Sequence, residues 1–342
     1  MQLTVIFLGT LVIQLDKIDV MNIFSSLFLA CQNTGSPEFG VAQTESTTTV
    51  QNSNTYSVGD LEFVPIPIET FTMGSPEDQN GRQPHPESDQ SVESDESQFQ
   101  VTLTTPYHLS TTEVTRGMFF AYIEDDEMGS ANCLEDACPV QFITWHMAAQ
   151  FTNMLSDTEG LAQCYNCSGS GRDVECESNF DGGQIYRCPG FRLPSEAEWE
   201  FAARSGTEYA IWTPNGGAEL PSGIEFECDD HTLSDGTYLS TLAWFCGSTD
   251  QAMPVGQLLA NDYGLYDMSG NVWEWVHDGY GEYPESAVIN YVSAPSGEHS
   301  LRGGRWGNEP YALRVAQRIH AEADFWDGNY GFRVAIRSNA VP

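Results

Sequence analysis

The segment most suggestive of chemistry in this 342-residue chain is Tyr263–Val276, with the sequence YGLYDMSGNVWEWV. It places oxygen-bearing side chains close together in the sequence. These residues are Asp267, Ser269, Asn271 and Glu274. Gly270 permits backbone conformations that a side chain would forbid. An acidic loop whose carboxylates and main-chain carbonyls converge suits a hard cation such as calcium. The alternative is a surface turn that leads into an aromatic core strand.

The residues that follow this loop predict a β-strand. Trp273 and Trp275 alternate with Glu274. Because successive side chains of a strand point to opposite faces, the two indoles share one face and Glu274 lies on the other. The strand would therefore hold the carboxylate at a fixed distance from the loop.

Further motifs occur in order along the chain and accompany GLYDMSGNVWEW. They are FTMGSPE at 71–77, TEVTRGMFFAYIED at 112–125, PVQFITWHMAAQFTNML at 139–155, GFRLPSEAEWEFAARSG at 190–206, LRGGRWGN at 301–308 and YGFRVAIRS at 330–338. Together they resemble the formylglycine-generating enzyme (sulfatase-modifying factor) family, over roughly residues 60 to 338. The resemblance implies a loop-rich α+β fold, the C-type-lectin-like variant, as a single domain with a flexible N-terminal tail.

The resemblance also implies where copper chemistry would lie. The oxidases of the family hold copper between two cysteines in a G-G-S-[YW]-x-C-x-x-x-x-C motif, and thiolates suit Cu(I). Here Arg305 stands at the serine, Asn308 at the first cysteine and Leu313 at the second. We therefore expect no copper site and assign no catalytic residue.

The resemblance supports a calcium site more strongly than it supports a copper site. One family site takes a side-chain oxygen at the position of Asp267, the carbonyls of Gly270 and Val272, and the carboxylate of Glu274. This chain keeps all four positions. We expect one structural calcium ion there.

Composition sets limits on the partners. The chain has 49 acidic and 13 basic side chains, for a formal charge of −36. Such a field repels nucleic acid and anionic lipid, so neither is expected as a partner. Acidic residues crowd the stretch 77–96, which we expect to be a solvated loop.

Arginines cluster near the closing motifs. They are Arg302, Arg305, Arg314, Arg318 and Arg333. We expect most of them to pair internally with carboxylates. Arg305, beside Trp306, is the candidate exception. It would point into the groove that corresponds to the family's active site and would hold an anionic ligand or peptide there.

The N-terminal residues suggest export. Residues 27–31, LFLAC, resemble a bacterial lipobox, in which Cys31 would be lipidated after cleavage, although Phe28 replaces the usual leucine. We assign 1–31 to a signal or lipoprotein leader, 32–60 to a polar linker and 61–338 to the folded domain. The predicted location is the cell envelope, with membrane attachment only through the lipid.

Eight cysteines remain beside Cys31, and an even number in an exported chain favours disulfides. The pairs suggested by spacing are Cys133 with Cys138, Cys167 with Cys176, Cys164 with Cys188, and Cys228 with Cys246. A zinc site built from the four cysteines between 164 and 188 is the alternative.

Three helices are predicted, at about 113–123, at about 145–155 and from Ser195 to near Gly206. Ser195 and Glu198 have the spacing of a capping box. Two classes of function follow. The first is an exported, non-catalytic binding or scaffold module, and the second is a formylglycine-generating-type oxidase or other enzyme with altered metal ligands.

Overall fold

Residues 55–82, 95–123, 132–223, 227–294 and 296–341 are described by the computed structural model. The leader with Cys31 and nearly all of the linker lie outside these residues, so the predictions about them stay predictions. None of the described helices is both long enough and apolar enough to cross a membrane. Strand β1 (Tyr56–Val58) falls within the segment assigned to the linker, so the sheet begins before residue 61.

Short strands form two larger sheets. The five-stranded sheet has the order β1-β2-β5-β14-β8, with β2 at Leu61–Ile66, β5 at Tyr107–Ser110, β14 at Ala335–Arg337 and β8 at Phe191–Arg192. The four-stranded sheet has the order β12-β11-β9-β13, with β12 at Arg318–Glu322, β11 at Glu298–Arg302, β9 at Trp273–Gly279 and β13 at Tyr330–Phe332. All seven residues of β9 are buried, so both of its faces pack against other parts of the fold.

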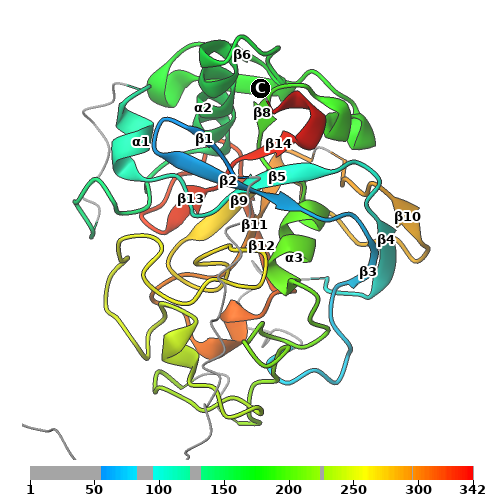
Figure 1. Ribbon diagram of the computed structural model, residues 1–342, viewed down its shortest axis with the longest axis vertical. Helices are drawn as coiled ribbons and strands as arrows, with labels where there is room; N and C mark the ends of the chain where they lie inside the picture. Colours follow the sequence, from blue (N-terminus) through cyan, green and yellow to red (C-terminus); the bar gives the residue numbers. More distant parts are fainter. Residues whose placement is uncertain (1–54, 83–94, 124–131, 224–226, 295, 342) are drawn as a thin grey trace, which may run out of the picture. The chain divides into compact units, whose positions relative to one another are not determined.

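Two smaller sheets complete the strand structure. One has the order β10-β4-β3, with β10 at Val288–Ile289, β4 at Phe99–Thr102 and β3 at Thr70–Met73. The other pairs β6 (Tyr165–Ser168) with β7 (Glu175–Ser178). The mixture of short strands, long loops and few helices agrees with the predicted α+β class (Figure 1).

The three helices lie where the sequence predicts them, with different ends. Helix α1 is only Arg116–Phe120. It starts late because Val114 is extended: its N–H donates to Phe332 and its carbonyl accepts from Val140. Helix α2 runs longer than expected, over Trp145–Thr158, and buries its apolar face.

Helix α3 (Glu196–Arg204) confirms the predicted capping box. Ser195 Oγ accepts from Glu198 N–H at 3.1 Å, and the Glu198 carboxylate accepts from Ser195 N–H at 2.8 Å. The helix ends at Ser205, which has the left-handed φ of 45°. Gly206 follows at φ 87°, a conformation that glycine adopts without a steric penalty.

Every residue of α3 is buried, including its three glutamates. Glu198 pairs with Arg192 at 2.6 and 2.7 Å. Glu196 pairs with Arg318 at 2.7 and 2.8 Å. Glu200 pairs with Arg302 at 2.5 Å and with Arg204 at 2.7 Å. Each carboxylate of α3 therefore has a guanidinium partner.

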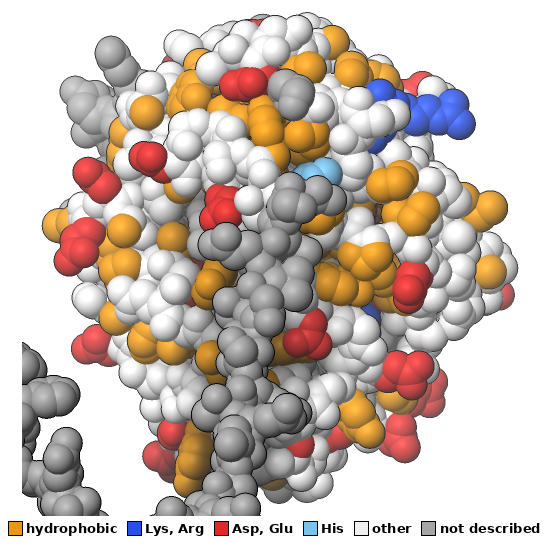
Figure 2. All heavy atoms as spheres, viewed as in Figure 1, with side chains coloured by type: hydrophobic (Ala, Val, Ile, Leu, Met, Phe, Trp, Pro, Cys, Tyr) orange, Lys and Arg blue, Asp and Glu red, His pale blue; other side chains and the backbone are white. Residues whose placement is uncertain are grey.

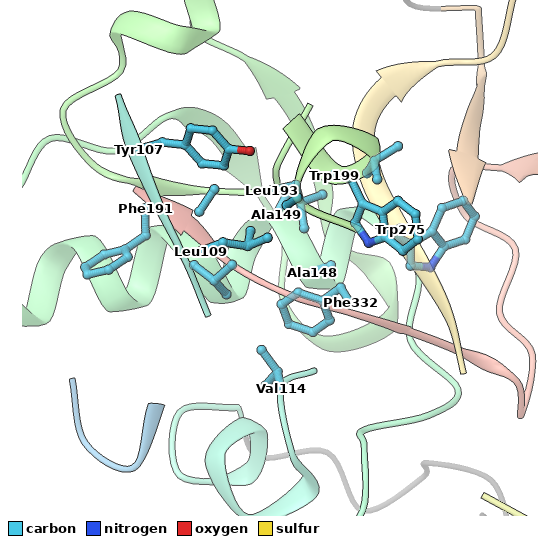
Figure 3. Close-up of a cluster of buried hydrophobic side chains, with 14 of the residues drawn as sticks. Tyr107, Leu109, Val114, Ala148, Ala149, Phe191, Leu193, Trp199, Trp275 and Phe332 are labelled. Carbon is cyan, nitrogen blue, oxygen red and sulfur yellow. The ribbon is translucent and has the colours of Figure 1, made fainter. Parts of the chain in front are cut away.

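The hydrophobic core surrounds this helix. In Figure 3, Trp199 of α3 and Trp275 of β9 lie at one end of the cluster and Phe191 of β8 lies at the other. All three are fully buried. Figure 1 shows α3 between the β10-β4-β3 sheet and the four-stranded sheet, in agreement with its contacts to β3, β9 and β11.

The four disulfides join the pairs that the spacing suggested. They are Cys133–Cys138, Cys164–Cys188, Cys167–Cys176 and Cys228–Cys246. The alternative of a zinc site between residues 164 and 188 is therefore wrong, because those four sulfurs bond to one another.

The expectation that residues 77–96 form a solvated loop is wrong at its end. Glu96 is 1% exposed, and its carboxylate accepts from Arg314 at 2.6 and 2.8 Å. The sequence pattern misses this because the partner lies 218 residues away. Residues 83–94 lie outside the described part.

The α3 ion pairs generate a prediction about stability. Glu196→Gln leaves Arg318 and Arg302 facing a neutral amide in the interior. Breaking a buried pair from one side leaves an uncompensated charge, so we expect a loss of about 3–5 kcal/mol in the free energy of unfolding. Urea denaturation measures it, with the exposed Glu62→Gln as the control. A loss equal to that of the control would contradict the prediction.

Candidate functional site

The loop predicted to bind a cation has an unusual backbone. Asp267, Gly270 and Asn271 adopt positive φ values of 56°, 88° and 60°. A Cβ on Gly270 would lie 2.1 Å from the carbonyl oxygen of Trp244, so this position needs glycine. The Trp244 carbonyl accepts from Asn271 N–H at 3.0 Å. The loop is thus held against a distant segment, and Asp267 and Gly270 are both buried.

Asp267 faces a second carboxyl group, that of Glu113, which the sequence did not single out. One Asp267 oxygen, Oδ2, accepts from Gly256 N–H at 2.7 Å. The other Asp267 oxygen and both Glu113 oxygens are buried and accept from no N–H donor of the described residues, and the two carboxyl groups lie close enough to share a proton. Burial raises the pKa of Asp267 to about 6, and burial with the charges of Asp267 and Glu274 raises that of Glu113 well above its usual range. A proton or a cation is needed between two such groups.

Glu274 has a different environment from the one predicted. Its carboxylate accepts from Arg333 Nε at 2.6 Å and Nη2 at 2.7 Å, and from Trp199 Nε1 at 2.7 Å. A carboxylate paired with a guanidinium carries no net charge to offer a cation. Of the predicted calcium residues, Asp267 therefore has a free buried oxygen, whereas Glu274 does not.

Glu113 precedes helix α1 in the TEVTR motif, and only its position in that motif distinguishes it in the sequence. Gln141 was missed in the same way: both polar atoms of its side chain are buried without a partner among the described residues. The fold, through the bonds that join Val114 to Val140, brings these two segments together. No local spacing could have shown it.

The positions of the copper cysteines have structural roles here. Asn308 Oδ1 accepts from Arg305 N–H at 3.0 Å and closes the turn, while the Asn308 carbonyl accepts from Cys246 N–H. Leu313 is fully buried in an apolar cluster with Leu220 and Phe245. All eight described cysteines are in disulfides, so this part of the chain holds no free thiolate.

The predicted pairing of the other arginines holds: Arg302, Arg314, Arg318 and Arg333 are buried in ion pairs. Arg305 differs. It is half-buried, forms no ion pair with a described residue, and touches Asn329 Oδ1 at 3.4 Å. Its guanidinium lies 5.5 Å from the ring centroid of Trp306.

Two aromatic side chains interact with Arg305, those of Trp306 and Tyr330. The charge of Arg305 opposes the rise in the pKa of Tyr330 to about 12 that burial and Asp327 cause. The Tyr330 ring lies 6.0 Å from Phe325, which is 48% exposed and precedes Trp326, 42% exposed. We name this group of residues (Arg305, Trp306, Phe325, Trp326 and Tyr330) the Arg305 surface. In the charge view of Figure 2, acidic side chains are spread over the face shown and basic ones are few.

Comparisons with known proteins agree with these observations. Residues 51–338 match the sulfatase-modifying factor enzyme 1-like domain. The chain is 30% identical over 263 residues to the formylglycine-generating enzyme of Streptomyces coelicolor, covering 67% of this chain and 78% of that protein. It is 29% identical over 247 residues to the chaperone protein LppX of Paenibacillus barcinonensis, covering 70% and 82%.

A third relative is the inactive C-alpha-formylglycine-generating enzyme 2 of Bos taurus, 33% identical over 162 residues, which cover 45% of this chain and 46% of that protein. Among solved structures, Treponema denticola variable protein 1 has a TM-score of 0.59 at 25% identity, covering 83% of this chain and 98% of that one. PvdO from Pseudomonas aeruginosa has a TM-score of 0.58 at 25% identity, covering 81% and 94%. The chain belongs to the sulfatase-modifying factor enzyme 1-like family, whose members include formylglycine-generating enzymes.

Proposed function

We propose that this chain is a non-catalytic member of its family that binds a carboxylate-bearing peptide through the Arg305 surface. The observation that carries the proposal is the conversion of the copper-ligand positions into structural ones. Asn308 closes a turn and Leu313 fills an apolar core, while Arg305 keeps an unpaired guanidinium at the same place. A permanent cation there favours an anion and opposes a metal ion.

The aromatic side chains near Arg305 favour a peptide over a small inorganic anion. Trp306, Tyr330 and the exposed Phe325 that packs against Tyr330 supply apolar contact area, and a guanidinium binds carboxylates through paired N–H donors. In a chain with a formal charge of −36, a half-buried cation that forms no ion pair with a described residue is also a selective feature, because most of the surface repels acidic ligands.

The names of the relatives support two candidates. The inactive enzyme of Bos taurus and the chaperone LppX are in line with a non-catalytic binding role. The formylglycine-generating enzyme of Streptomyces coelicolor supports the second candidate, an oxidase with altered ligands. We favour the first because the described residues supply no free thiolate for copper.

The proposal predicts a specific effect of Arg305→Gln. A fluorescein-labelled peptide rich in glutamate and phenylalanine should bind the full chain, and the variant should lose about 1.5–3 kcal/mol of binding free energy, the usual value of a charged hydrogen bond. Fluorescence anisotropy gives the Kd. The exposed Arg187→Gln is the matched control, and a peptide with glutamine for glutamate tests the role of charge.

Two results would contradict this proposal. One is equal binding by the Arg305→Gln and Arg187→Gln proteins. The other is conversion of cysteine to formylglycine in a C-x-P-x-R peptide incubated with the protein, copper and oxygen, detected by mass spectrometry above the no-protein background. The second result would establish the oxidase.

We also propose that calcium binds between Asp267 and Glu113. The three buried oxygens that lack donors are hard ligands, and a cation would remove the repulsion between the two carboxylates. This differs from the ligand set that the family resemblance implies, because Arg333 already neutralises Glu274. The carbonyls of Gly270 and Val272 remain candidates from the resemblance.

Calcium should raise the melting temperature and EDTA should lower it. If calcium binds only the native state, a calcium concentration one hundred times the Kd raises the free energy of unfolding by about 2.7 kcal/mol. The Glu113→Gln protein should not gain this stability from calcium. In EDTA it should be as stable as the parent, because the substitution also removes the repulsion between the Glu113 and Asp267 carboxylates. Calorimetry with and without calcium measures both effects, with Glu62→Gln as the control. A full calcium response in Glu113→Gln would place the ion elsewhere.

The location of the protein is a separate proposal. The four disulfides and the LppX relative are consistent with an extracytoplasmic location. We further propose a lipid anchor, on the lipobox-like sequence that ends at Cys31. Mass spectrometry of the native N-terminus should find a lipidated Cys31 as the first residue. An unmodified Cys31 within a longer chain would rule the anchor out.

A further inference from the structure

A cavity of about 710 Å³ lies beside strand β3, away from the Arg305 surface. Its walls come from β3, from β4 and from the end of helix α3, and residues 285–287 close one side. Figure 1 shows β3, β4 and β10 at the side of the fold next to α3. The volume lies within the usual range for ligand sites, about 300–1,000 Å³.

Strand β3 is an edge strand of the described sheet, since β4 is its only sheet partner among the described residues. Leu103 N–H donates to the Glu69 carbonyl at 3.0 Å, and Thr70 is opposite Thr102. In an antiparallel ladder, hydrogen-bonded and non-bonded pairs alternate. The N–H and C=O groups of Thr70 and Thr72 therefore point away from β4, toward the free edge.

These four main-chain groups have no hydrogen-bond partner among the described residues. The side chains of the strand do not turn back to satisfy them. Thr70 Oγ1 bonds instead to Thr102 Oγ1 at 2.8 Å, and Thr72 Oγ1 accepts from Gln100 Nε2 at 2.6 Å. These bonds hold β3 in register with β4, so its free edge is presented as a regular strand.

The charges around the cavity are acidic. Glu69, Glu208 and Glu285 line it, and all three side chains are exposed. The one arginine in the wall, Arg204, is 6% exposed, pairs with Glu200 at 2.7 Å and donates to the Gly74 carbonyl, so its guanidinium is turned into the protein. A cationic partner therefore fits, and an anionic one does not.

The segments of this chain that lie outside the described residues do not carry the positive charge that would complement the cavity. Residues 1–54 contain one basic side chain, Lys17, and residues 83–94 contain no lysine or arginine but three acidic residues. Charge complementarity thus favours another protein over the chain's own tail or loop.

We propose that the β3 edge is a docking site for an extended, basic peptide segment of another protein. The segment adds as a strand to Thr70 and Thr72, and its main chain supplies the missing hydrogen-bond partners. Lysine or arginine side chains at alternate positions reach the carboxylates of Glu69, Glu208 and Glu285. Main-chain pairing supplies affinity and the carboxylates supply selectivity.

The test uses the full chain and a labelled peptide of four Lys-Val repeats. A second peptide is N-methylated on alternate residues, which keeps the charge and removes the donors that face β3. A third has Glu-Val repeats. Fluorescence anisotropy should show binding of the first alone. Its Kd should rise with salt, because the charges are exposed.

Variants separate main-chain pairing from charge. Thr72→Pro removes an outward N–H without breaking a β3–β4 hydrogen bond, and proline is tolerated in edge strands at such positions. It should weaken binding about tenfold. Thr72→Val, which keeps the N–H and loses only the hydroxyl, should bind like the parent. Replacing the three glutamates by glutamine should weaken binding and flatten its salt dependence.

Hydrogen exchange tests the proposal on the unmodified chain, so its result does not depend on whether a variant folds. The amides of Thr70 and Thr72 should exchange quickly in the free chain and slowly with the Lys-Val peptide bound. Four outcomes would overturn the proposal: no binding by the folded chain, equal binding of the N-methylated peptide, unchanged binding by a folded Thr72→Pro protein, or edge amides already protected in the free full chain. The last would mean that the chain covers its own edge.

Discussion

The fold depends on burying a helix that carries three carboxylates. Moving an ion from water into the interior costs several kcal/mol unless it is paired and hydrogen-bonded. Helix α3 meets this condition with arginines from separate elements: Arg192 from β8, Arg302 from β11 and Arg318 from β12. Glu200 also accepts from the Gly74 N–H, just after β3. One short helix therefore joins three sheets through charged contacts, and these contacts specify its position.

This arrangement explains the surface as well as the interior. The chain has only 13 lysines and arginines, and six arginines are buried in ion pairs with glutamate: Arg192, Arg204, Arg302, Arg314, Arg318 and Arg333. Few cations remain outside to balance the other carboxylates. The acidic surface is thus partly a consequence of how the interior is built. Against that background Arg305 is set apart by its place beside Trp306 and Asn308, because Arg116 and Arg187 also form no ion pair with a described residue. An acid-lined edge such as β3 is an ordinary feature, and its unpaired main-chain groups are what would make it selective.

The parts of the fold that sequence reasoning predicted are local or carried by the family motifs. Ser195 and Glu198 are three residues apart, and the nested cysteines between 164 and 188 close short loops, so spacing alone suggested both. The contacts that sequence reasoning did not predict join groups that lie far apart in the chain. Glu96 is neutralised by Arg314, 218 residues away, and Glu274 by Arg333, 59 residues away. Neither Glu113 nor the free edge of β3 could have been identified before the segments that face them were known.

The same separation of local and distant contacts is seen at the Asn308 turn. The ion pairs of α3 do not involve the turn that carries Asn308. There, a side-chain amide closes the turn through Arg305 N–H, and Leu313 packs with Leu220. An amide and an alkyl side chain supply these local contacts without binding a metal, so the stability of the fold places no requirement for cysteine at either position. The loop that carries Asp267 differs, because Asp267 and Glu113 each have buried carboxyl oxygens without a donor among the described residues. A proton or a cation would remove that cost, and this is the physical basis of the proposal that calcium binds there.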